Sequence, residues 1–141
     1  MKKVVTVSLG SSKNDFEFET DFLGHRFSVK RLGADDDTGK AWELARRQQA
    51  TADAIGLGDI ADHYQVGLRT VVNKATRRLL NVVTRVPVTT GATLRRLLQV
   101  RAVRHVQKEL GHYFNNNLVL FLSGMRYYDM AVALSDYTKN L

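Results

Sequence analysis

The stretch LVLFLSGMRYYDMAVAL, residues 118–134, decides the fold class. Residues 118–122 are all apolar and run into Ser123-Gly124, after which apolar residues recur at helical spacing. A strand that is apolar on both faces is typical of a parallel sheet covered by helices, and such sheets bind ligands outside the carboxyl ends of their strands. We therefore predict a central strand at residues 118–122 and a turn at Gly124 into a helix around Ala131.

Two other runs have the composition of buried strands. Residues 4–9, VVTVSL, are rich in β-branched side chains and end at Gly10. Residues 52–57, ADAIGL, are followed by Gly58-Asp59. Together with residues 118–122, these runs are predicted to be the central strands of one sheet.

The region between them has the pattern of a hairpin. Residues 15–22 alternate between Phe or Thr and Asp or Glu, which indicates a half-buried strand. Gly24 offers a turn, and residues 25–30 place Arg26 and Lys30 at the polar positions of the returning strand. An antiparallel hairpin commonly accompanies a parallel core. A second hairpin is expected around Gly67.

Four stretches show the spacing of amphipathic helices, around Lys40, Lys74, Leu97 and Ala131. With the strands, they predict an α/β fold with a Rossmann-like three-layer sheet, mainly parallel with antiparallel hairpins. The longest helix, residues 92–110, is expected to bury one side, formed by Leu94, Leu97, Leu98 and Ala102.

Three consecutive aspartates, residues 35–37, precede the first of these helices. They can cap the helix, whose amino terminus favours negative charge, or they can belong to a metal loop. The spacing of a Ca²⁺ loop and its terminal Glu are missing, which favours capping. The four histidines also lack metal-ligand spacing, so no metal site is expected.

Composition limits the classes of protein. The chain has 141 residues, 44% hydrophobic content and no cysteine, which excludes disulfides, Cys-based zinc sites and a thiol nucleophile. Its apolar runs are too short to cross a membrane, so we expect a cytoplasmic protein with no membrane partner. A single α/β domain over residues 1–141 is expected. Because no strand follows the last helix, this domain would be the amino-terminal portion of a longer protein or would be completed by a partner chain, and we expect a homo-oligomer.

Positive charge is concentrated in one region. The formal net charge is +7, and residues 63–108 contain ten Lys and Arg but no Asp or Glu. Such a stretch can attract nucleic acid or an anionic ligand, although charge on amphipathic helices more often forms a solvated face. A nucleic-acid partner is not expected, because neither a helix-turn-helix nor interleaved exposed aromatic residues are recognisable.

Three polar residues interrupt the apolar side of the longest helix. Arg101, His105 and Glu109 follow one another at intervals of four residues and continue the leucine stripe. They can form a buried acid–base or anion-binding row, or they can lie in solvent where the helix leaves the core. The second interpretation is favoured, because no facing carboxylate or nucleophile is identified.

The turn at Ser123-Gly124 also has the composition of an anion site. Backbone N–H groups after Gly124 would lie at a helix amino terminus, and Arg126 would add a cation. A phosphate or carboxylate would be the ligand of such a site. The alternative is a plain strand-to-helix turn with Arg126 in solvent.

Four segments resemble one known family. VVTVSLGSS at residues 4–12, ADAIGLGDI at 52–60, LRTVV at 68–72 and VPVTTGATLRR at 86–96 resemble, in this order, the amino-terminal part of bacterial proteins of the quinate 5-dehydrogenase-like family. The resemblance implies a dehydrogenase-like protein that uses NAD or NADP on a polyhydroxylated cyclic acid such as quinate or shikimate.

The resemblance assigns cofactor positions but no catalytic residue, because Asn73-Lys74 has no neighbouring Asp. A non-enzymatic anion- or nucleic-acid-binding α/β module and a structural or regulatory subunit are the alternatives. The candidate cofactor-binding residues are the glycine turns with their adjoining polar residues, namely Gly10, Ser11, Ser12, Gly56, Gly58, Ser123, Gly124 and Arg126.

Overall fold

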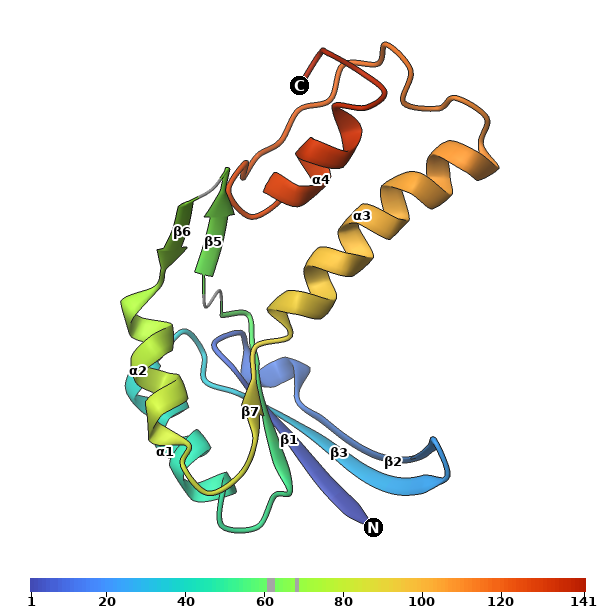
Figure 1. Ribbon diagram of the computed structural model, residues 1–141. Helices are drawn as coiled ribbons and strands as arrows, with labels where there is room; N and C mark the ends of the chain where they lie inside the picture. Colours follow the sequence, from blue (N-terminus) through green and yellow to red (C-terminus); the bar gives the residue numbers. More distant parts are fainter. Residues whose placement is uncertain (61–62, 68) are drawn as a thin grey trace. The chain divides into compact units, whose positions relative to one another are not determined.

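The computed structural model describes residues 1–60, 63–67 and 69–141. It consists of two compact units, each described by itself below (Figure 1). Unit 1 contains Met1–Asp62 and Asn73–Gly91, and unit 2 contains His63–Val72 and Ala92–Leu141. Leu68, which belongs to the predicted second hairpin, lies outside the described residues.

Unit 1 is built on a five-stranded mixed sheet with the order β2-β3-β1-β4-β7. Strands β3, β1, β4 and β7 are parallel, and β2 pairs with β3 in the antiparallel direction. This arrangement confirms the predicted α/β class, with a mainly parallel sheet and an antiparallel hairpin. The strands are β1 (Lys2–Ser8), β2 (Phe16–Phe22), β3 (His25–Gly33), β4 (Ala54–Gly58) and β7 (Val88–Thr89).

Both α-helices of unit 1 begin at side-chain caps. In α1 (Thr38–Gln48), the Asp37 carboxylate accepts hydrogen bonds from the Gly39 and Lys40 amides at 2.8 and 3.0 Å. In α2 (Lys74–Val82), the Asn73 side chain does the same for the first turn. A third element, η1 (Ser12–Asn14), is a single 3-10 turn after β1. The aspartate stretch therefore contributes a helix cap.

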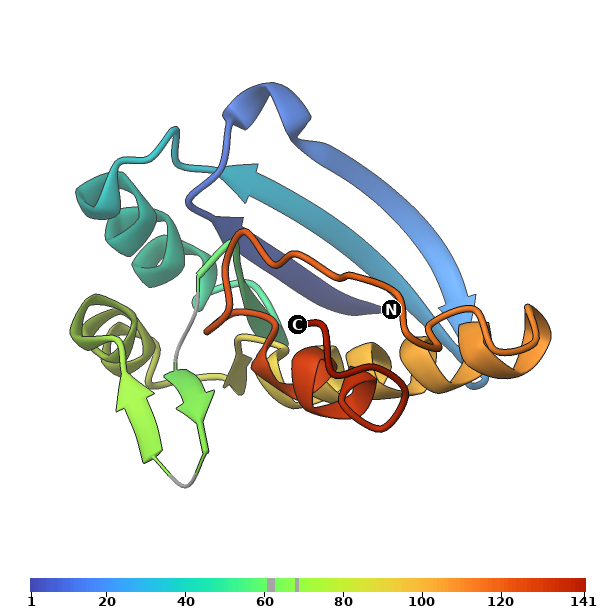
Figure 2. The ribbon, with the colours of Figure 1, turned by 90° about the horizontal axis from the view of Figure 1, so that it is seen from above.

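The core of unit 1 lies on one face of the sheet. Helices α1 and α2 lie side by side on that face (Figures 1 and 2). They cover it because every second residue of the inner strands is apolar and points to the same side of the sheet. In the described part of unit 1, no helix covers the opposite face. The buried contacts join Val5, Val7, Ile55 and Leu57 of the strands to Ala41, Ala45 and Leu79 of the helices.

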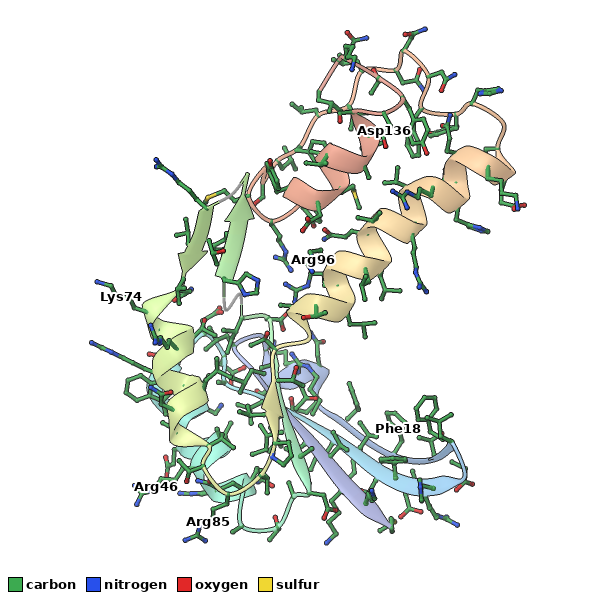
Figure 3. The ribbon with its side chains drawn as sticks, in the orientation of Figure 1. Phe18, Arg46, Lys74, Arg85, Arg96 and Asp136 are labelled. Carbon is green, nitrogen blue, oxygen red and sulfur yellow. The ribbon has the colours of Figure 1, made fainter. Side chains whose placement is uncertain are left out.

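The β2–β3 hairpin separates charge from aromatic rings. Glu17 pairs with Lys30 and Glu19 with Arg26, each at 2.8 Å. These pairs are exposed and each contributes at most about 1 kcal/mol. The phenylalanines of β2, Phe18 among them, alternate with these glutamates and lie on the other face of the sheet, where their rings are exposed (Figure 3).

Unit 2 has a second, smaller core. It contains the antiparallel hairpin of β5 (His63–Val66) and β6 (Arg69–Val72), and the helices α3 (Ala92–Glu109) and α4 (Tyr128–Leu134). The buried residues Val103, Ala133 and Leu134 join the two helices. Among the described helices, none is both long and apolar enough to cross a membrane.

The predicted central strand at residues 118–122 is wrong. These residues follow the loop after α3 and pair with no strand. Only Val119 and Phe121 pack against the small core of unit 2, whereas the three leucines between and beside them are exposed. The physical reason is that an apolar run shows which residues can be buried but not whether a sheet is available to bury both faces.

The predicted buried side of the long helix is also wrong. Leu94, Leu97 and Leu98 are exposed, and α3 turns Val100 and Val103 towards α4 instead. The leucine stripe and the valine stripe are both apolar, so spacing alone does not choose between them. The row that continues the leucine stripe, Arg101, His105 and Glu109, is therefore exposed, in agreement with the solvent interpretation.

We expect Ile55→Ala to destabilise unit 1 by about 2–5 kcal/mol, because Ile55 is fully buried between the sheet and α1. Urea unfolding followed by the fluorescence of Trp42, the single tryptophan, on α1, measures this change. Leu23→Ala is the matched control in the same unit, since Leu23 is exposed and its replacement should change stability by less than about 0.5 kcal/mol. Equal effects of the two substitutions would contradict the core described above.

Candidate functional site

The carboxyl ends of three strands meet at one edge of the sheet in unit 1. Because β1, β3 and β4 are parallel, Ser8 at the end of β1 is in register with Gly33 of β3 and Gly58 of β4. The chain leaves β1 towards the β3 side and leaves β4 towards the β7 side. Ligands of open α/β sheets bind where neighbouring connections diverge in this way. The loops after β1 and β4 are thus the candidate site.

Arg31 organises this edge. Its side chain is only 13% exposed, so its charge needs partners within the protein. The guanidinium donates to Ser8 Oγ at 2.9 Å and to the Ser11 carbonyl at 3.0 Å. It also forms ion pairs with Asp15 at 3.1 Å and Asp59 at 3.6 Å. One side chain therefore connects β3 to the segments that follow β1 and β4.

Ser8 determines how Asp59 is held. The Ser8 side chain is buried, and its oxygen accepts hydrogen bonds from Arg31 and from the Gly10 amide at 3.0 Å. A hydroxyl that accepts twice has one proton left to donate, and Asp59 Oδ2 lies 2.5 Å away. In the part of the chain that the structure describes, the other carboxylate oxygen of Asp59 makes no hydrogen bond. The side chain is 59% exposed, so this oxygen is available to a ligand.

The backbone at Asp59 has an unusual conformation. Its φ is 55°, in the left-handed region that non-glycine residues rarely adopt. Asp35 and Asp36, after β3, share this conformation with φ of 54° and 62°. Aspartate tolerates the left-handed region better than most residues. The turns after both strands therefore direct carboxylates to the same edge.

Two glycines allow the loops to approach closely. A Cβ at Gly33 would lie 2.5 Å from backbone atoms of Ser11 and Ser12, far inside van der Waals contact. A Cβ at Gly10 would lie 2.9 Å from Asp59 Oδ2 and 3.0 Å from Arg31 Nη2. Gly33 is required for space, because the atoms in the way are backbone; at Gly10 they are the ends of side chains, which would have to shift.

A second polar contact fixes the loop after β1. Asp35 accepts a hydrogen bond from the Ser12 amide at 2.6 Å and forms an ion pair with Lys40 Nζ at 2.6 Å. The hydrogen bond from Lys40, followed by that from Ser12, holds the pKa of Asp35 well below its ordinary value. The same bond to Asp35 raises the pKa of Lys40. The loop is thus joined to the first turn of α1.

The structure brings together some of the residues predicted from the sequence. Gly10, Ser11, Ser12 and Gly58 lie at the carboxyl edge, and Gly56 lies two residues earlier on β4, beside Thr6 of β1. Their proposed contact with a cofactor stays a prediction.

The other predicted residues, Ser123, Gly124 and Arg126, belong to unit 2 and are exposed. The expected strand-to-helix turn is wrong, because no strand precedes Gly124 and α4 begins only at Tyr128. The cap residue, Tyr127, also makes no side-chain cap bond. Gly124 therefore does not place its following amides at a helix amino terminus.

Sequence reasoning missed Ser8, Arg31 and Asp35, and it treated Asp59 only as part of a glycine turn. One signal was available: the alternation that places Phe27 and Val29 on the apolar face of β3 also places Arg31 there. An arginine at an apolar position of a strand indicates a buried charge with partners. The carboxylates that meet it depend on turn conformations that the sequence pattern does not reveal.

The basic stretch predicted from the sequence is divided between the two units. In the described structure, none of its ten Lys and Arg forms an ion pair. Lys74 and Arg85, with Arg46 of α1, point away from the sheet (Figure 3). On unit 2, Arg104 and Lys108 line a concave pocket together with Asp136. These charges form solvated surfaces on both units.

The described residues contain no group of three or more His, Asp or Glu side chains arranged to hold a metal ion. The carboxylates of the edge are instead paired with Arg31, Lys40 and backbone amides. The chemistry that this edge offers is therefore hydrogen bonding, with Asp59 as an acceptor.

We expect Lys40→Met to raise the pKa of Asp35 towards 3.8, its ordinary value, because the substitution removes the largest cause of the shift. Because the pKa of Asp35 is lower in the folded protein, its ionised form stabilises the folded loop at every pH above the ordinary pKa. This stabilisation is lost as the pH falls through the lower pKa of the folded state. An NMR titration of the Asp35 carboxyl group measures the change. Lys13→Met is the control, since Lys13 is not among the groups that shift the pKa of Asp35, and the substitution should leave the titration unaltered.

We expect Gly33→Ala to lower the free energy of unfolding of unit 1 by about 1–3 kcal/mol, because the added methyl group would displace the Ser11–Ser12 backbone. Hydrogen exchange at the Ser12 amide should accelerate as its bond to Asp35 is lost. Gly124→Ala has no atom within 4 Å of the added Cβ and should leave stability unchanged. Full protection of Ser12 in Gly33→Ala would disprove the close approach.

Two family models match the chain. The model described as Domain of unknown function (DUF8753) matches residues 3–90, and the model described as Domain of unknown function (DUF8754) matches residues 93–141. No curated protein and no solved structure matches the chain. The first match extends over the five-stranded sheet and its carboxyl edge, and it covers more than half of the sequence. The chain therefore belongs to the DUF8753 family, with a DUF8754 domain in its carboxyl-terminal third.

Proposed function

We propose that the protein is a cytoplasmic NAD(P)-dependent dehydrogenase-like protein that acts on a polyhydroxylated cyclic acid such as quinate or shikimate. One observation supports this proposal above the others: the Asp59 side chain, one oxygen of which makes no hydrogen bond within the described residues, lies where the connections of β1 and β4 diverge. The cofactor class and the reaction come from the sequence resemblance. The geometry supports a contact at the carboxyl edge of the sheet, with Asp59 as a hydrogen-bond acceptor.

Charge at the edge decides which part of a ligand fits there. Arg31 and Lys40 stand against the carboxylates of Asp15, Asp35 and Asp59. A phosphate would meet these carboxylates, whereas a hydroxyl group can donate to Asp59. A ribose diol or a hydroxyl of the cyclic acid is therefore the group that we place next to Asp59.

The loop after β1 would contact the rest of the cofactor. It leads into η1, a 3-10 turn of three residues, and not into an α-helix. A pyrophosphate near Gly10 would therefore depend on backbone amides and serine hydroxyls, without the dipole of a long helix. No residue is assigned to hydride or proton transfer.

The competing proposal is a non-enzymatic module that binds single-stranded nucleic acid. It is favoured by the exposed rings of Phe16, Phe18 and Phe22 on β2, because such binders stack bases on exposed aromatic side chains. It is disfavoured because β2 itself carries no Lys or Arg that would bind phosphates beside these rings. We rank it second for that reason.

We also propose that the protein self-associates. The support is that large leucines of unit 2, on α3 and in residues 118–122, are exposed to solvent. Large apolar side chains left exposed can belong to an interaction site.

The dehydrogenase proposal predicts that Asp59→Asn weakens binding of NAD or NADP, or of quinate or shikimate, by about 10- to 100-fold, since a hydrogen bond to a charged group contributes about 1.5–3 kcal/mol. Calorimetric titration of each ligand measures the change. Asp21→Asn is the matched control, because it removes the same charge from the far end of the hairpin. Arg126→Ala tests whether unit 2 contributes to the same binding.

Thermal unfolding of each variant separates a loss of binding from a loss of structure, since Asp59 also accepts the Ser8 proton. Absence of binding by all four ligands to the wild-type protein would refute the dehydrogenase proposal. Equal weakening by Asp59→Asn and Asp21→Asn would remove Asp59 from the site. Tight, strongly salt-dependent binding of single-stranded DNA or RNA would favour the competing proposal.

A further inference from the structure

Residues 118–122 form an extended apolar segment on unit 2. Val119 and Phe121 pack on the core of the unit, whereas Leu118, Leu120 and Leu122 are 84%, 84% and 97% exposed. This alternation has the period of two that is typical of extended backbone. The segment thus has the side-chain pattern of a strand, with one face covered by its own unit and the other uncovered.

The backbone of this segment has the unpaired groups of an edge strand. Val119 donates to the Asn140 carbonyl at 2.9 Å. Over the described chain, the N–H groups of residues 120–122 make no hydrogen bond. Extended segments with free donors and acceptors are templates for the addition of another strand.

We propose that residues 118–122 pair in the antiparallel direction with the same residues of a second copy, across a twofold axis at Leu120. The sequence LVLFL reads almost the same in both directions. Pairing about Leu120 therefore places Leu118 opposite Leu122, and Val119 opposite Phe121. Pairs of aromatic and β-branched residues stabilise antiparallel strands, and the leucines of both copies would pack together on one face.

The absence of charge in this segment permits a second copy as the partner. Each chain carries a formal net charge of +7, so two copies repel one another over most of their surfaces. Residues 110–125 contain no Asp, Glu, Lys or Arg, which makes this the segment through which two copies approach with least repulsion. An isologous contact also requires a self-complementary surface, and the LVLFL pattern has this property.

This inference rests on the proposed self-association and adds the surface that produces it. A strand from a different protein is the other occupant that the unpaired backbone admits. The two differ in one observable: only self-pairing brings Leu120 of one copy next to Leu120 of another.

The absence of native cysteine allows a direct test. Directly opposed residues of antiparallel strands have Cα atoms roughly 4.5–5.5 Å apart, within the roughly 4.4–6.8 Å that a disulfide spans. Leu120→Cys should therefore form a disulfide-linked dimer under mild oxidation, visible on a non-reducing gel. Leu23→Cys, at a residue 81% exposed on unit 1, is the control and should crosslink several-fold less.

Sedimentation velocity of the full chain supplies the second measurement. Leu120→Lys should weaken association by at least about tenfold, because each copy loses a contacting leucine and places a lysine opposite its symmetry mate. Leu23→Lys should leave association unchanged. A wild-type chain that stays monomeric at high concentration would refute self-association and this surface together. A wild-type dimer that survives Leu120→Lys, or whose Leu120→Cys variant crosslinks no better than the control, would refute this surface alone.

Discussion

The neutralisation of Arg31 is the interaction on which the candidate site depends. A guanidinium that is 13% exposed cannot rely on water, and it therefore draws Asp15, Asp59 and Ser8 to the end of β3. Each partner comes from a different segment of the chain. The loops after β1 and β4 consequently have few alternatives, since moving either one leaves a charge without its partner. The surface ion pairs of the β2–β3 hairpin impose no such requirement, because water can replace them.

This constraint also explains the selectivity that we infer for the edge. The acidic partners of Arg31 satisfy its charge from within the protein, so the arginine is not available to bind a phosphate. Ser8 donates a hydrogen bond to one oxygen of Asp59, and the other oxygen faces solvent. A buried cation with acidic partners thus accounts for the hydroxyl contact that we propose at Asp59. The same set of residue types would favour an anion if the arginine were exposed and the carboxylates were paired elsewhere.

Sequence reasoning succeeded where structure depends on neighbouring residues. The β-branched run of β1, the short apolar run of β4, the alternation of β2, and the helix cap within the aspartate stretch are local features, and each is present as predicted. It failed where burial depends on distant partners. The two apolar stripes of α3 have equivalent spacing, and only the position of α4 selects Val103 over Leu97. The carboxylates around Arg31 come from residues 15 and 59, which are distant in the sequence, and Asp59 lies in a turn with an unusual backbone angle.

Residues 118–122 show how this failure arises. Five apolar residues in succession make both faces of a strand apolar. The sequence therefore lacks the alternation of polar and apolar residues that would distinguish an inner face from an outer face. The extended backbone that we predicted there fits the observed burial pattern, but the covering layers are absent from the described unit. Val119 and Phe121 suffice to cover the small core between α3 and α4. The leucines that alternate with them contribute nothing to that core. Pairing of this charge-free segment with the same segment of a second copy, as we propose, would bring the leucines of both copies together.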